Sequence, residues 1–361
     1  MSIEFAERIR RMPSYPLAAG YDLGAEIALL ASNESAFAPL PQVVEAAHRA
    51  LAGAHRYPDP SYWPLRRALA DRYGIPPERI ALGNGSCDIL LAAGAALLEP
   101  GAEILYAWPS FSMYPHLAAA SDARAIQVPL DVDERHDLGA MAAEITVATR
   151  LVLICNPNNP TATALPLDEI EVFLARVPRH VCVILDEAYC EFALALGDPY
   201  ASVELLRRHS NLVLLRTFSK VYGLAGMRVG YALCATEAFR AAVEQVRQPF
   251  YLNVAAHAAA VEALRHQDDV ERRVTSAIAS RLELEDGLRR LGLWVAEADA
   301  NFLWARLPDG VEETDVIAGL RDRGVLVRAG RSLGRDGAMR VTVGTDAENR
   351  KFVAAMAELL A

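Results

Sequence analysis

Lysine is almost missing from this chain. Lys220 and Lys351 are the only two lysines in 361 residues, whereas lysine and arginine together number 36. Acidic residues outnumber basic ones, 46 to 36, and the formal net charge is −10. Broad binding to nucleic acid needs a basic face, so this balance argues against a nucleic-acid partner. Small anionic ligands are still compatible with it, because a few arginines in a pocket suffice to bind them.

Cysteine is also scarce, and long apolar runs are lacking. The cysteines are Cys87, Cys155, Cys182, Cys190 and Cys234, and none forms a C-x-x-C pair. An odd number of them in a long chain fits a reducing compartment, and we predict no metal site. The N-terminal MSIEFAERIRRMP has no apolar core of a signal peptide, and no apolar run reaches membrane-spanning length. We therefore expect a cytoplasmic protein without a membrane partner.

Short apolar runs alternate with helical stretches over much of the chain. After an N-terminal arm, residues 1–32, we expect helices after Pro41 and after Trp63, the second ending at Gly74. The runs RIALGN, AEILYAWP, RLVLICNP, VCVILDEAY, NLVLLRTFS and RVGYALC are short and apolar throughout, as is typical of strands covered on both faces. This alternation predicts a large α/β domain, residues 33–240, in which helices sandwich a mainly parallel sheet.

The pattern changes after about residue 240. A long helical stretch, VERRVTSAIASRLELEDGLRRLG, is followed by the short runs NFLWARL, VLVRAG and MRVTVG. We interpret residues 241–361 as a smaller C-terminal α+β domain.

Polar segments follow the predicted strands, at the edge where α/β sheets bind ligands. They are GNGSCD (83–88), CNPNNPTAT (155–163), DEAY (186–189) and RTFSK (216–220). The glycines of GNGSCD allow backbone amides to face an anion at a helix N-terminus. A plain turn with Ser86 as helix cap explains the same residues, and both interpretations stay open.

Asp186 and Lys220 are the most informative of these polar residues. A buried carboxylate after VCVIL needs a cation or hydrogen-bond donors, so Asp186 is a helix cap, the partner of an arginine, or a carboxylate facing a cationic ring nitrogen. Asn159 is either an ordinary turn residue or part of the same site. A desolvated lysine acts as a Schiff-base amine, a role that arginine does not take. A solvated loop lysine is the alternative, but Ser219 and Arg228 flank Lys220 with anion-binding groups.

Together these residues suit pyridoxal phosphate, which needs a phosphate cradle, a carboxylate for the pyridine nitrogen, donors for the phenolate oxygen and an imine lysine. CNPNNPT, LDEAY, RTFSK and GLAGMRVGY, in this order, resemble the fold-type I pyridoxal-phosphate-dependent aminotransferases of class I/II. SNESAF (32–37), RYPD (56–59) and RVTVGT (340–345) extend the likeness over nearly the whole chain. Within that family the chain resembles the histidinol-phosphate aminotransferase group, close to the aromatic amino acid aminotransferases.

The resemblance implies roles for the cofactor site. Lys220 would carry the cofactor as a Schiff base and move the proton, and Asp186 would keep the pyridine nitrogen protonated. Tyr189 and Asn159 would hydrogen-bond the phenolate oxygen, and Phe111 would stack over the ring. The cofactor phosphate would be bound by the Ser86 and Cys87 amides, Thr217, Ser219, Arg228 and, in a homodimer with shared active sites, Tyr57 from the other subunit.

The resemblance also implies a substrate site. Arg340 would clamp the carboxylate of the amino donor or the 2-oxo acid, Arg328 would contact the distal phosphate of histidinol phosphate, and Tyr15 would line the same pocket. The first expectation is transfer of the amino group of L-histidinol phosphate to 2-oxoglutarate, a step of histidine biosynthesis. The alternatives are an aromatic amino acid (phenylalanine/tyrosine) aminotransferase, a threonine-phosphate decarboxylase and a non-catalytic pyridoxal-phosphate-binding module.

Three departures from the family pattern leave the amino donor open. Ala162 stands where N-P-T-G has its glycine. Cys87 and Asp88 stand where the group commonly has Asp or Asn followed by Glu, which removes a polar contact to the substrate phosphate. Phe111 lacks the phenol of the tyrosine that is frequent in relatives.

Overall fold

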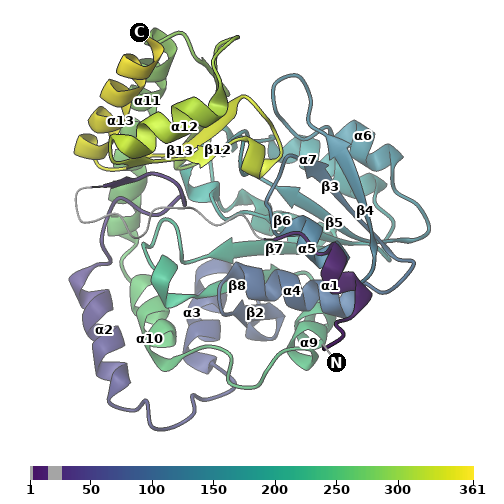
Figure 1. Cartoon of the computed structure of the whole chain (residues 1–361). Helices are drawn as coiled ribbons and strands as arrows, with labels where there is room; N and C mark the ends of the chain where they lie inside the picture. Colours follow the sequence, from purple (N-terminus) through teal and green to yellow (C-terminus); the bar gives the residue numbers. More distant parts are fainter. Residues whose placement is uncertain (1–2, 15–26) are drawn as a thin grey trace.

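A computed structural model describes residues 3–14 and 27–361 of the chain (Figure 1). Its strands are β1 (Ala28–Leu29), β2 (Ile80–Gly83), β3 (Glu103–Trp108), β4 (Arg124–Pro129), β5 (Thr149–Cys155), β6 (Cys182–Asp186), β7 (Leu212–Thr217), β8 (Gly230–Cys234), β9 (Trp294–Val295), β10 (Phe302–Arg306), β11 (Val325–Leu326), β12 (Arg328–Ala329) and β13 (Ala338–Thr342). Its α-helices are α1 (Glu7–Arg11), α2 (Pro41–Leu51), α3 (Trp63–Tyr73), α4 (Ser86–Leu97), α5 (Tyr114–Ala120), α6 (Leu138–Ala143), α7 (Leu167–Arg176), α8 (Leu205–Arg208), α9 (Glu237–Gln245), α10 (Val254–Ala263), α11 (Gln267–Arg290), α12 (Glu313–Asp322) and α13 (Asp346–Leu360). Short 3-10 turns are η1 (Pro77–Arg79), η2 (Cys190–Phe192), η3 (Leu194–Leu196), η4 (Ala201–Glu204), η5 (Ala225–Met227) and η6 (Arg331–Leu333).

The large sheet has seven strands in the order β2-β8-β7-β6-β5-β3-β4. Neighbouring strands are parallel except at β8, which runs antiparallel to both β2 and β7. All six predicted strands of the large domain are present, and the mainly parallel α/β class is confirmed. The edge strand β4 was not predicted because it contains no apolar run. Four of its six residues are exposed and have polar or small side chains.

Helices cover both faces of this sheet. Alternate strand residues point to opposite sides, and each side has its own apolar core. Ile104, Leu153 and Val213 pack with residues of α4, α5 and α9, whereas the neighbouring Leu105 and Val152 pack with residues of α3, α7 and α8. Burial on both faces explains why the strands are apolar throughout.

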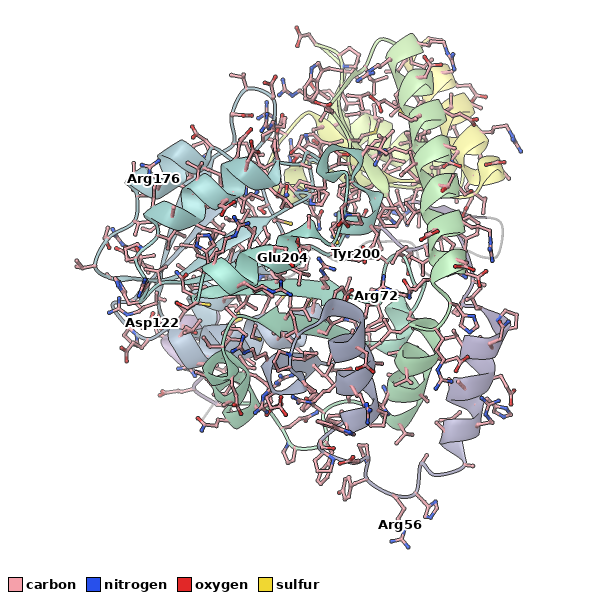
Figure 2. The ribbon with its side chains drawn as sticks, turned by 180° about the vertical axis from the view of Figure 1, so that it is seen from behind. Arg56, Arg72, Asp122, Arg176, Tyr200 and Glu204 are labelled. Atoms are coloured by element: carbon pink, nitrogen blue, oxygen red, sulfur yellow. The ribbon has the colours of Figure 1, made fainter. Side chains whose placement is uncertain are left out.

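On the back of the molecule, a polar contact joins α3 to the segment between β6 and β7. The Arg72 guanidinium donates a 2.7 Å hydrogen bond to the Tyr200 hydroxyl and lies 4.7 Å from the centre of that ring. The two residues face each other in Figure 2. This contact anchors the chain that follows Asp186.

The C-terminal part forms a smaller antiparallel sheet in the order β12-β13-β10-β9, flanked by α11, α12 and α13 (Figure 1). Strand β1 pairs in parallel with β11, so residues 28–29 of the arm join this part of the molecule. Helix α10 packs against α2 and α3. The boundaries at residues 32 and 240 stay predictions.

The helices formed by residues 3–14 and 27–361 include none with the length and apolar character needed to cross a membrane.

Candidate active site

A cavity of about 490 Å³ lies at the carboxyl ends of β5, β6 and β7. It brings together most of the residues predicted from the sequence, although they come from positions 86 to 340. Its lining includes Ser86, Cys87, Phe111, Asn159, Asp186, Tyr189, Thr217, Ser219, Lys220, Arg228, Arg328 and Arg340. Tyr57 does not line it, and Tyr15 lies outside the described residues.

The N-terminus of α4 forms one end of the cavity. The helix begins at Ser86 with Gly85 as its cap residue, so the interpretation of Ser86 as a side-chain cap is wrong: no side-chain cap bond is made. Gly85 has φ +82°, and a Cβ placed there would lie 2.4 Å from the Arg228 guanidinium. A Cβ on Gly230 would lie 2.4 Å from the Ser86 backbone nitrogen. The two glycines therefore let Arg228 and β8 approach the first amides of α4, which is a favourable place for an anion.

Hydroxyl groups and Arg228 complete this end of the cavity. Thr217 and Ser219 are buried at the end of β7, and the Thr217 hydroxyl accepts a 3.1 Å hydrogen bond from the Ser219 backbone amide. Arg228 donates to the Ala225 carbonyl at 2.9 Å. Arg228 lines the cavity and is exposed, whereas the next residue, Val229, is buried.

Asp186 is the last residue of β6 and is 3 % exposed. It accepts hydrogen bonds of 3.2 Å from the Tyr114 hydroxyl and 3.2 Å from the Ala188 amide. Among the described residues no arginine, lysine or histidine forms an ion pair with it, which argues against the arginine-partner interpretation. Burial raises the pKa of Asp186 to about 6, because the two neutral donors do not offset the loss of water.

Lys220 follows β7 by three residues rather than ending the strand itself. Its ammonium donates a 3.1 Å hydrogen bond to the Ser32 carbonyl and lies 5.6 Å from the centre of the Tyr189 ring. Burial, and then the positive charge of Arg340, lowers the pKa of Lys220 to about 8. Lys220 is therefore a desolvated amine in a cavity and not a solvated loop lysine.

Tyr189 and Asn159 lie on the same wall. The Tyr189 hydroxyl accepts a 3.1 Å hydrogen bond from the side-chain amide of Asn33, and burial raises the pKa of the phenol. The side-chain oxygen of Asn159 accepts from the Arg340 guanidinium. The remaining donors of both residues, the phenol O–H and the Asn159 amide, are thereby left for a shared acceptor.

Two buried arginines face the cavity from adjacent strands. Arg328 of β12 and Arg340 of β13 are directly opposite each other in the antiparallel pair, and both are less than a tenth exposed. Arg340 also donates to the Ala31 carbonyl at 2.6 Å. Both arginines line the cavity, where a guanidinium group can bind a carboxylate or a phosphate.

The three departures from the family pattern lie in different local environments. Ala162 is buried with φ +63°, the left-handed conformation for which glycine is better suited. Asp88 accepts from the Asn84 amide at 3.0 Å and pairs with Arg247 at 3.1 Å, so it holds the turn between β2 and α4. Phe111 lines the cavity and packs edge-on against Tyr114, with ring centres 5.7 Å apart.

Sequence reasoning gave no role to residues 31–34, which line the same cavity. Ser32, Asn33 and Glu34 begin SNESAF, and these polar residues follow the apolar run 29–31 without a helical or strand period of their own. Leu333 of η6 was also missed, because the fold of the C-terminal part brings its side chain to the cavity.

Tyr57 lies apart from the cavity of its own chain. It is 81 % exposed and stacks on Phe250, with ring centres 4.5 Å apart and ring planes at 22°. Its neighbour Arg56 projects from the outer loop between α2 and α3 (Figure 2).

The donor set of this cavity fits pyridoxal phosphate. Buried Asp186, whose hydrogen-bond donors within residues 3–14 and 27–361 are neutral, is suited to a protonated pyridine nitrogen, and the amides at the start of α4 are suited to a phosphate. Lys220 lines the same cavity. A mainly parallel sheet with these groups at its carboxyl edge defines a fold-type I pyridoxal-phosphate-dependent enzyme.

Comparison with known proteins agrees with this class. The sequence profile described as Aminotransferase class I and II matches residues 25–356. The chain is 39% identical to an aromatic amino acid aminotransferase of Cutibacterium acnes, over 99% of both chains. It is 42% identical to a histidinol-phosphate aminotransferase 2 of Ralstonia nicotianae, over 93% of this chain and 90% of that one. The structure of a histidinol-phosphate aminotransferase from Sinorhizobium meliloti in complex with pyridoxal-5'-phosphate superposes with a TM-score of 0.88, at 29% identity, over 100% of this chain and 98% of that one.

The chain belongs to the class I and II aminotransferases. It is an enzyme with pyridoxal phosphate as its cofactor, and it transfers an amino group between an amino donor and a 2-oxo acid.

Proposed function

We propose that the amino donor is an aromatic L-amino acid and that the acceptor is a 2-oxo dicarboxylic acid such as 2-oxoglutarate. The observation that carries this proposal is the pair of buried arginines opposite each other on β12 and β13. Arg340, which is next to Asn159, binds the α-carboxylate common to all substrates. Arg328 binds the second carboxylate of the dicarboxylic acid. An aromatic donor has no second anion, so its ring packs against the apolar lining, which includes Phe111 and Leu333.

The chain's own residues divide the remaining work. Pyridoxal phosphate, when bound, supplies an electron sink that makes the α-proton of the donor acidic. Lys220 would hold the cofactor, and its free amine would move the α-proton as a general base. Asp186 keeps the pyridine nitrogen protonated, and Tyr189 and Asn159 donate to the phenolate oxygen. Phe111 stacks on the ring, while the Ser86 and Cys87 amides, Thr217, Ser219 and Arg228 bind the phosphate.

Histidinol phosphate is the second candidate, and it was the first expectation from the sequence. Arg328 favours it, because a buried guanidinium is equally suited to a phosphate. Asp88 argues against histidinol phosphate, because its carboxylate already binds Arg247 and the Asn84 amide. The relatives named above include one of each kind, and the one matched over 99% of both chains is an aromatic amino acid aminotransferase.

A panel of single half-reactions tests the choice. Phenylalanine, tyrosine, histidinol phosphate and threonine phosphate are each mixed with the loaded enzyme, and the loss of cofactor absorbance is followed. We expect phenylalanine and tyrosine to react with higher kcat/KM than histidinol phosphate. A clear preference for histidinol phosphate would reverse the order of the two candidates, and release of carbon dioxide from threonine phosphate would replace both.

The variant Arg328→Gln separates the two anion sites. It removes the second positive charge and keeps a hydrogen-bonding side chain. We expect kcat/KM for 2-oxoglutarate to fall by about 100-fold, as for loss of a charge-assisted hydrogen bond, and that for phenylalanine to change little. An equal loss for both substrates would contradict the assignment of Arg328.

We also propose a cytoplasmic homodimer in which Tyr57 of one subunit reaches the cofactor phosphate of the other. The exposure of Tyr57 and its distance from its own cavity support this arrangement.

A further inference from the structure

A short backbone segment, residues 31–33, touches three groups of the active site. The Ala31 carbonyl accepts from Arg340, and the Ser32 carbonyl accepts from the Lys220 ammonium. The third contact is made by a side chain, the amide of Asn33, which donates to the Tyr189 hydroxyl at 3.1 Å. Asn33 is 1 % exposed and was given no role by the sequence.

The orientation of the Asn33 amide is fixed by its surroundings. The backbone N–H of Asn33 donates to the Thr342 hydroxyl at 2.9 Å, and this hydroxyl donates in turn to the side-chain oxygen of Asn33 at 3.2 Å. Asn301 holds the Asn33 carbonyl from the other side at 3.3 Å. Because the side-chain oxygen is engaged by Thr342, the NH₂ group of Asn33 faces Tyr189.

This orientation determines what the phenol of Tyr189 does with its proton. An amide NH₂ donates and does not accept, so the Tyr189 oxygen is the acceptor in this pair. The single phenol proton is then directed elsewhere, and Tyr189 lines the cavity. Asn159 is constrained in a similar way, because its oxygen accepts from Arg340 and its amide donors remain.

We propose that Asn33 is a positioning residue that directs the phenol proton of Tyr189 toward the phenolate oxygen of pyridoxal phosphate. This inference rests on the proposed role of Tyr189 as a donor to that oxygen. Without Asn33 the phenol proton has no fixed direction, and the negative charge on the phenolate oxygen is stabilised more by the proton of the neighbouring imine. That proton is then held more tightly.

The test is a double-mutant cycle read by absorbance rather than by turnover. The variants are Asn33→Gly, Tyr189→Phe and both together, each loaded with pyridoxal phosphate. Glycine is chosen because Asn33 has φ +53°, which glycine adopts without strain. The measurement is the pH midpoint of the absorbance change of the Lys220-bound cofactor. We expect each single variant to raise this midpoint by about one unit, as for loss of one hydrogen bond to a charged group.

The double variant decides the result. If Asn33 acts through the phenol, adding Asn33→Gly to Tyr189→Phe moves the midpoint no further. A shift in the double variant equal to the sum of the two single shifts would overturn the inference. If the midpoint does not shift in Tyr189→Phe, the proposed role of Tyr189 is wrong, and so is the inference about Asn33. If it shifts in Tyr189→Phe but not in Asn33→Gly, only the inference about Asn33 is overturned.

Two further variants guard against a structural effect. Thr342→Val keeps Asn33 but removes the hydroxyl that orients its amide, so its midpoint should rise in the same direction as that of Asn33→Gly and by a smaller amount. If Asn33→Gly does not fold, Asn33→Ser retains a short polar side chain that does not reach the phenol, and we expect it to give the same shift as Asn33→Gly.

Discussion

At the scale of single residues, Lys220 is set apart by its environment as much as by its rarity. The chain has 34 arginines among its 36 basic residues, but only a lysine amine both loses its proton and forms an imine. The cavity lowers the pKa of Lys220 to about 8, chiefly by burial and then by the charge of Arg340. At pH 7 a pKa near 8 makes the free amine roughly 300-fold more abundant than at an ordinary lysine.

The rate of cofactor uptake should follow this pKa. The cofactor-free protein is mixed with pyridoxal phosphate at a series of pH values, and imine formation is followed by stopped-flow absorbance. We expect the rate to rise with pH with a midpoint near 8, because the free amine attacks the aldehyde. Lys220→Ala should form no protein imine and should abolish multiple turnover. A midpoint above 10 would contradict the pKa, and turnover like that of the wild type in Lys220→Ala would contradict the mechanism.

Burial raises the pKa of Asp186, whereas it lowers that of Lys220. The raised pKa makes the cofactor-free protein less stable. The pKa of Asp186 rises from 3.8 unfolded to about 6 in the folded protein. As pH rises from about 4 to 6, the unfolded state loses its proton first, so the free energy of unfolding falls. Above pH 6 the carboxylate is charged in both states, and the penalty of about 3 kcal/mol is complete.

Asp186→Asn should therefore stabilise the cofactor-free protein and inactivate the loaded enzyme. The asparagine carries no charge to bury, so urea unfolding should show a gain that is about 1 kcal/mol larger at pH 8 than at pH 5. The amide does not hold a protonated pyridine nitrogen, so kcat should fall by several orders of magnitude. An equal stability gain at both pH values would show that the pKa of Asp186 is not raised.

At the scale of elements, the strands were predictable and much of the site was not. Apolar runs covered on both faces identify β2, β3, β5, β6, β7 and β8, and the polar residues that follow them lie at one edge of the sheet. Asp186 and Lys220 were therefore proposed as site residues from local pattern, and both line the cavity. Arg328 and Arg340 were placed by resemblance alone, because nothing local shows that β12 and β13 face the ends of β5 and β6.

The parts of the site that the sequence did not predict depend on contacts between distant segments. The hydrogen bond from Asn33 to Tyr189 joins residues 156 positions apart, and the buried ion pair of Arg216 with Glu187 joins β7 to the residue after Asp186. Such pairs depend on the packing of whole elements, so a sequence pattern with a period of two or 3.6 residues does not contain them.

The packing of β8 against α4 gives a prediction at this scale. In Gly230→Ala the new Cβ would meet the Ser86 nitrogen at 2.4 Å and the Gly85 carbonyl carbon at 2.8 Å. These are backbone atoms, so α4 must shift and its first amides lose their alignment with the phosphate. We expect the affinity for pyridoxal phosphate to fall by at least about 10-fold, as for loss of one good charge-assisted hydrogen bond.

Gly226→Ala is the matched control. It lies close in sequence and lines the same cavity, but a Cβ there meets nothing within 4 Å. Fluorescence titration of the cofactor-free variants measures both affinities. Equal affinities of Gly230→Ala and Gly226→Ala would show that the position of α4 does not control phosphate binding.

At the scale of the whole molecule, the site of a single chain is incomplete if Tyr57 belongs to it. Tyr57 and Phe250 stack at the surface, away from the cavity, and the exposed Trp63 begins the helix that follows the Tyr57 loop. Exposed aromatic residues of this kind are typical of a protein–protein interface. A second copy of the chain is the partner that the proposed function requires.

Hybrid dimers test whether Tyr57 acts in the other subunit. In a hybrid of the wild type with a chain carrying both Tyr57→Phe and Lys220→Ala, the only site with Lys220 receives the altered Tyr57. In a hybrid of Tyr57→Phe with Lys220→Ala, the only site with Lys220 receives an intact Tyr57 from the other chain. We expect the first hybrid to bind pyridoxal phosphate about 10-fold more weakly than the second, because one hydrogen bond to a charged phosphate is lost. Equal affinities, or the reverse order, would place Tyr57 outside the neighbouring site, and a monomer in sedimentation would remove the shared site altogether.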